Sequence, residues 1–131
     1  MKKSILSKLA KKEARELKKK ATREELDQLD FRSLGPASAS RCIYGQMTGD
    51  CFSDRASRLI HQCAERVYDV REKGMAHAAL NGKPKEDRQM FRYYSPIEIF
   101  IHNMQNRENG NNEILVDYLK GKTKTLKFKK F

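Results

Sequence analysis

The chain has 131 residues, of which 38% are hydrophobic and 34% are charged, and it contains no tryptophan. This length suits a single domain with a modest core, and the composition is too apolar for a wholly disordered chain. No apolar run is long enough to span a membrane, and Lys8 interrupts the apolar residues near the N-terminus where a secretion signal would need a continuous run. We therefore expect a cytoplasmic protein.

The net charge of +11 is concentrated at the two ends of the chain. Residues 1–20 contain nine basic and two acidic residues, residues 120–131 contain six lysines and no acid, and residues 21–119 are left with a net charge of −2. Cationic ends attract polyanions, so the first expected partner is nucleic acid and the second is an acidic protein.

The N-terminal region is expected to be a basic helical arm. Residues 2–20 are rich in good helix formers, but their apolar stripe is thin, which predicts light docking or pairing with a second copy in a homodimer. Thr22 and Glu25 have the spacing of a capping box, which predicts a second helix to about Phe31. One continuous, kinked helix is the alternative.

The middle of the chain is organised around a predicted core helix over residues 52–73. Residues 33–41 read as a linker, and residues 42–51 as a short strand or a tightly turned buried loop. In the core helix, the apolar residues fall on one arc at the helical period. These residues are Phe52, Ala56, Leu59, Ile60, Cys63, Val67 and Val70.

Two further helices are expected near the C-terminus. Ser95, Pro96 and Glu98 supply an N-cap, a first-turn proline and a capping-box acid, which favours a helix over a strand through residues 97–101. Residues 113–120 read as a second helix, and the last nine residues alternate as in an edge strand or form a basic tail. The predicted fold is therefore α+β and predominantly helical, divided into a basic arm (1–31), a helical core domain (32–121) and a basic strand or tail (122–131).

Cys51 is a candidate nucleophile because Gly49-Asp50-Cys51-Phe52 leads directly into a predicted helix, where a thiol pKa can be lowered. These residues resemble the start of the cysteine-bearing helix of papain-like and transglutaminase-like enzymes. The resemblance covers about ten residues and lacks the tryptophan that often follows the papain cysteine. It implies a small transferase or hydrolase, with His102 or His77 as the partner base.

The three cysteines have two other interpretations. A zinc site formed by Cys42, Cys51, His61 and Cys63 is disfavoured, because His61 and Cys63 point to opposite sides of one helix and no Cys-x-x-Cys pair exists. Buried structural cysteines are the leading interpretation, since an odd count argues against a disulfide framework. We expect no metal and no cofactor.

Residues 41–55 are the leading candidate for a specific ligand site. Arg41, Tyr44, Gln46 and Arg55 cluster near one helix start and would suit a nucleotide or one base of a nucleic acid, with Arg58 close by. Internal salt bridges are the alternative for each arginine. The candidate contacts to a polyanion backbone are Lys11, Lys12, Lys18, Lys19, Lys20, Lys127, Lys129 and Lys130.

The functional prediction is a small nucleic-acid-binding or nucleotide-binding accessory protein, of the kind that phages and mobile elements encode. No P-loop, dinucleotide fingerprint or helix-turn-helix pattern is present to make it more specific. The alternatives are the cysteine enzyme centred on Cys51 and an adaptor for an acidic protein partner.

Overall fold

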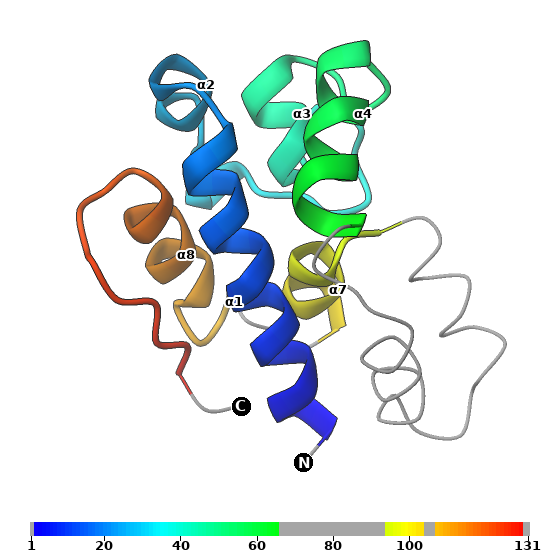
Figure 1. Ribbon diagram of the computed structural model, residues 1–131. Helices are drawn as coiled ribbons and strands as arrows, with labels where there is room; N and C mark the ends of the chain where they lie inside the picture. The colour runs from blue at the N-terminus through cyan, green and yellow to red at the C-terminus, as the bar shows by residue number, and fades with distance from the viewer. Residues whose placement is uncertain (1, 66–93, 104–106, 130–131) are drawn as a thin grey trace, which may run out of the picture.

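The computed structural model describes residues 2–65, 94–103 and 107–129 (Figure 1). Six α-helices occur in these ranges: α1 (Lys2–Lys20), α2 (Arg23–Asp27), α3 (Ile43–Thr48), α4 (Asp54–Leu59), α7 (Pro96–Asn103) and α8 (Asn111–Leu119). A 3₁₀ turn, η1 (Phe31–Ser33), follows α2, and a π-helix, η2 (Ile60–Glu65), extends α4. The described ranges contain no strand, so the expected α+β class is wrong and the fold is helical.

The C-terminal segment shows why an edge strand was expected and why none forms. Leu126 and Phe128 are half-buried against the core while Lys127 and Lys129 are exposed, so the alternation is real. The backbone of this segment, however, forms its hydrogen bonds with a side chain and not with another strand. Lys129 donates its N–H to Oδ1 of Asn111 at 2.7 Å and accepts from Nδ2 of the same residue at 3.3 Å. An asparagine of α8 therefore takes the place of a neighbouring strand.

Helix α1 docks far more deeply than its thin apolar stripe suggested. It packs against α7, η2 and α8 across the middle of the molecule (Figure 1). The stripe is fully buried because two of its members are alanines, which allow neighbouring helices to approach closely. Five apolar side chains of α1 are at most 1% exposed: Leu6, Leu9, Ala10, Ala14 and Leu17. The expected light docking is therefore wrong.

The break between α1 and α2 is fixed by the predicted capping box. Glu25 donates its N–H to Oγ1 of Thr22 at 3.1 Å, and Thr22 donates its N–H to Oε1 of Glu25 at 2.8 Å. Two separate helices, rather than one kinked helix, follow from this reciprocal pair.

The segment 42–51, expected to be a strand or a tight loop, contains the short helix α3. Cys42 caps its start, since Sγ accepts from the N–H of Gly45 at 3.3 Å. Gly49 ends it in a left-handed conformation with φ +93°, which favours glycine. The two glycines that suggested a turn therefore lie within and after a helix.

The predicted core helix begins at Asp54, with Oγ of Ser53 accepting from the N–H of Ala56 at 3.2 Å. Ala56, Leu59 and Cys63 are buried as expected, but Phe52 is 83% exposed because it precedes the helix. The part of this prediction over residues 66–73 lies outside the described residues.

Both C-terminal helices are confirmed as α7 and α8. Ser95 accepts from the N–H of Glu98 at 3.3 Å, as the capping prediction requires. The carboxyl group of Glu98 does not complete the box. It turns into the core and accepts from the N–H of Ile43 at 2.7 Å.

Gly45 provides a test of the packing between α3 and the loop before it. A Cβ at this position would overlap the carbonyl oxygen of Ala39, which already accepts from the N–H of Cys51 at 2.8 Å. We expect Gly45→Ala to lower the free energy of unfolding by about 1–3 kcal/mol or more, because a backbone contact cannot yield as a side chain can. Urea unfolding measures this, with Ser57→Ala on the exposed face of α4 as the control. Equal stability of both variants would contradict the close approach.

Candidate functional site

The two basic ends of the chain lie on the same part of the molecule. The segment after α8 runs back antiparallel to α1 (Figure 1), and near its far end Phe128 lies beside Lys11 in the middle of α1. Its upper end is held by Arg23, which donates to the carbonyl oxygen of Lys120 at 3.0 Å. Its lower end is held by Phe128, whose ring lies 4.3 Å from that of Phe100 in α7. We call the outward side of α1 together with residues 120–129 the cationic face.

Lysines of α1 contact aromatic rings of the C-terminal segment and of α8. Nζ of Lys11 lies 6.0 Å from the ring centre of Phe128, and Nζ of Lys18 lies 4.4 Å from that of Tyr118. These cation–π contacts hold the ammonium groups at the surface beside the C-terminal lysines. Positions 8, 11, 15 and 18 recur every three or four residues, so their basic side chains form one stripe along α1.

Few acids neutralise the cationic face. Lys19 pairs with Glu16 at 3.7 Å and Lys122 with Asp117 at 3.8 Å, and the lysine of each pair is about 70% exposed. Solvent-exposed pairs of this kind contribute little and are easily exchanged. Residues 120–129 include five lysines and no acid. The face therefore keeps a strong positive potential.

Most of the predicted backbone-contacting lysines lie on this face. Lys11, Lys12, Lys18 and Lys19 lie on the outward side of α1, and Lys127 and Lys129 are exposed in the C-terminal segment. Lys20 ends α1 on the side of α4 and η2, where its carbonyl oxygen accepts from Arg55. Lys130 lies outside the described residues.

The predicted ligand cluster of Arg41, Tyr44, Gln46 and Arg55 is not gathered around one space. Arg55 binds Glu25 through two hydrogen bonds of 2.8 and 2.7 Å and also reaches the carbonyl oxygen of Lys20 at 3.2 Å. Gln46 pairs with the backbone of Asp30, donating at 3.1 Å and accepting at 2.9 Å. Arg41 and Arg58 are exposed. The alternative of an internal salt bridge describes Arg55, whose hydrogen bonds lower the pKa of Glu25 to about 2.

Tyr44, the fourth member, belongs to a buried cluster that sequence reasoning missed. Its hydroxyl donates to Oε2 of Glu13 at 2.6 Å, and Oε1 of Glu13 accepts from the N–H of Ile97 at 2.9 Å. Glu13 is 0% exposed. A signal for this burial was present, because position 13 continues the stripe of Leu6, Leu9, Ala10 and Leu17 on α1.

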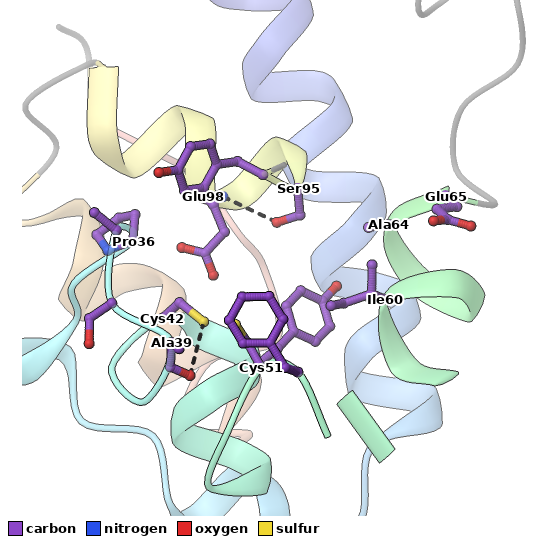
Figure 2. Close-up of a pocket in the computed structure, with 14 residues that line it drawn as sticks. Pro36, Ala39, Cys42, Cys51, Ile60, Ala64, Glu65, Ser95 and Glu98 are labelled. Carbon is purple, nitrogen blue, oxygen red and sulfur yellow. Dashed lines mark hydrogen bonds between the residues drawn. The ribbon is translucent and has the colours of Figure 1, made fainter. Parts of the chain in front are cut away.

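A second buried acid, Glu98, points into a cavity beside this cluster (Figure 2). The cavity has a volume of about 370 Å³. Its walls come from residues 36–39, Cys42 and Tyr44 of α3, Cys51 and Phe52, residues of η2, and the start of α7. Figure 2 shows the carboxyl group of Glu98 directed from α7 toward Cys42 and Cys51.

Both buried acids hold their protons more tightly than usual. Burial raises the pKa of Glu13 to about 7, although the hydrogen bonds from Tyr44 and Ile97 lower it. Burial, reinforced by the charge of Glu13, raises the pKa of Glu98 to about 8. Perturbed acids beside a cavity are typical of functional sites, but buried structural networks shift pKa values in the same way.

The geometry does not favour an activated cysteine. Burial raises the pKa of Cys42 and of Cys63 to about 12, and burial also raises the pKa of Cys51. His102 is exposed on α7 and its ring stacks on Tyr94 at 6.2 Å, while His77 lies outside the described residues. The features that lower a thiol pKa, a nearby cation or a long helix N-terminus, are therefore not supplied to Cys51 by its described neighbours.

The comparisons with known proteins leave the geometry as the only guide to function. No protein family, curated protein or solved structure matches this chain significantly. Within the described residues, no group of three or more histidine, cysteine or acidic side chains is placed to hold a metal ion. No helix in the described part of the chain is both long and apolar enough to cross a membrane.

The raised pKa values of Glu13 and Glu98 predict how stability varies with pH. The folded state keeps protons that the unfolded state loses above about pH 4.5, so stability falls as pH rises from there to about 8. We expect Glu98→Gln to flatten this profile. At pH 8 the free energy of unfolding of the variant should exceed that of the wild type by roughly 1–3 kcal/mol, since each unit of pKa is worth about 1.4 kcal/mol. Its amide oxygen can still accept from Ile43. Chemical unfolding from pH 5 to 9 measures this, and an unchanged profile would contradict the burial of the acid.

Thiol reactivity provides a separate test of the cysteine interpretation. We expect all three thiols of the native protein to react with iodoacetamide at pH 7 more slowly than a free cysteine, because their raised pKa values leave little thiolate. Cys51, which is only half-buried, should react first. The unfolded protein is the control for full reactivity. Alkylation of Cys51 faster than the free amino acid would restore the enzyme hypothesis.

Proposed function

We propose that the protein binds a polyanion, most specifically the phosphate backbone of nucleic acid, through the cationic face in a reducing cytoplasm. The observation that supports this is the anchoring of residues 120–129 beside α1. Asn111, Phe100 and Arg23 fix the segment, so lysines that are distant in sequence share one surface. A folded cationic surface loses less conformational entropy on binding than two loose tails would lose.

The shape of the face suits contact with a backbone rather than with bases. Helix α1 has 19 residues and is therefore about 28 Å long, which places its basic stripe along several successive phosphates. Three of the four residues that were expected to bind a base, Tyr44, Gln46 and Arg55, are engaged within the protein, and Arg41 is exposed. We therefore expect binding that depends strongly on salt and weakly on sequence.

The burial of the apolar stripe of α1 also helps to decide which kind of partner this helix binds. Pairing with a second copy was one of two expectations for this stripe, but most of it is buried in the core of its own chain. The exposed side of α1 is polar and basic, which favours an anionic partner over a second basic helix.

A pair of triple variants separates the cationic face from bulk charge. Arg15→Gln, Lys124→Gln and Lys127→Gln remove three exposed charges from the face, whereas Arg41→Gln, Arg58→Gln and Arg107→Gln remove three exposed charges elsewhere. We expect the first variant to bind generic duplex DNA or RNA at least about tenfold more weakly and to lower the salt slope by roughly two to three units. The second variant should stay close to the wild type.

Fluorescence anisotropy with unrelated sequences at several salt concentrations measures both quantities. Equal weakening by the two variants would show that net charge alone drives binding and would contradict the face. Binding of poly-glutamate but not of nucleic acid would replace the proposal with an acidic protein partner.

A further inference from the structure

The cavity beside α7 contains a polar atom that the described part of the chain leaves unused. Glu98 is 4% exposed, and its Oε1 accepts from the N–H of Ile43 at 2.7 Å. Its Oε2 is buried and has no hydrogen-bond partner in the described residues. A buried polar atom without a hydrogen-bond partner costs free energy, so it needs an explanation. Because this side chain points into the cavity, a ligand that donates to it is the simplest explanation (Figure 2).

The lining of the cavity differs in composition from the chain as a whole. The protein carries a net charge of +11, yet the described residues that line the cavity include two acids, Glu65 and Glu98, and none of these described residues is a lysine, arginine or histidine. A third acid, Glu13, lies behind Tyr44 and binds its hydroxyl at 2.6 Å. When Glu98 is ionised, a cavity with this lining favours a cationic ligand over an anionic or neutral one.

The remaining walls favour an apolar ligand body. Aromatic rings of Tyr44, Phe52 and Tyr94 contribute to the lining together with Ile60 and Ala64. The volume of about 370 Å³ is at the small end of the range for ligand sites. Aromatic and aliphatic walls around a single carboxylate suit a cation joined to a small hydrophobic group, since ring faces attract ammonium ions.

We propose that this cavity binds a small primary amine with an aromatic or aliphatic tail, whose ammonium group donates to Oε2 of Glu98. The tail packs between the aromatic rings and η2. This activity is separate from polyanion binding, because it uses a lining without basic residues rather than the cationic face.

Binding must remove a proton from Glu98, whose pKa is about 8 in the free protein because of burial and the charge of Glu13. The other described titratable groups that line this region are Cys42 at the start of α3, Tyr44 on α3, Cys51 in the following turn, Glu65 at the end of η2 and Tyr94 before α7. The proton passes to the solvent when the ammonium group pairs with the carboxylate. The affinity should therefore rise by roughly tenfold or more between pH 6 and pH 8.

Calorimetry with 2-phenylethylamine, hexylamine and the neutral isostere 2-phenylethanol tests the proposal. At pH 8 we expect both amines to bind the wild type and 2-phenylethanol to bind at least about tenfold more weakly, as expected for loss of a charged hydrogen bond. Glu98→Gln keeps the acceptor for Ile43 but lacks the charge, and it should weaken amine binding to a similar extent. Titration in two buffers of different ionisation enthalpy should count the proton released at pH 7.

Glu65→Gln is the matched control. It removes an acid from the same cavity, but Glu65 is 64% exposed and is paired with His61 at 2.8 Å, so its loss should change the affinity by less than about threefold. Equal binding of amine and alcohol, equal weakening by both variants, or no binding of either amine would overturn the proposal. Thermal unfolding confirms that each variant is folded, and the polyanion affinity of Glu98→Gln should match that of the wild type.

Discussion

The carboxyl group of Glu13 lies where three helices meet, and it is completely buried. It receives the hydroxyl of Tyr44 from α3 and the backbone N–H of Ile97 from α7, while its own backbone belongs to α1. Removing one donor would leave a buried acceptor unpaired, which costs about 1–3 kcal/mol. This single side chain therefore orients α1, α3 and α7 relative to one another. Glu98 links two of the same helices in a similar way, because its carboxyl group on α7 accepts from the N–H of Ile43 at the start of α3.

The two candidate surfaces follow from this arrangement. Because Glu13 and the apolar stripe of α1 face inward, the basic residues of α1 must face outward, beside α8 and the C-terminal segment. Because Glu98 turns toward α3 instead of back to its own helix start, one of its oxygens reaches the cavity. The same helix contacts thus set a cationic face on one side of the core and an acidic cavity within it.

The helices were largely predictable because they depend on local chemistry. The capping box at Thr22 and the Ser-Pro start at residues 95–96 were both confirmed. Apart from residues 42–51, where the short helix α3 was not expected, the errors concern contacts between distant residues. The alternation of Leu126 and Phe128 indicates a buried face, but only the fold shows that Asn111, rather than a strand, provides the backbone partner. The periodicity places Glu13 on the buried stripe, yet its partners Tyr44 and Ile97 are 31 and 84 residues away.

The central claim is that the basic helix α1 is part of the core and that Glu13 holds it there. Native-state hydrogen exchange of the α1 backbone amides tests this directly. The account predicts that amides around Leu9 to Leu17 exchange only through global unfolding, as slowly as those of α7, and that Tyr44→Phe speeds both helices together. Exchange of α1 through a separate, low-energy opening while α7 stays protected would contradict the account.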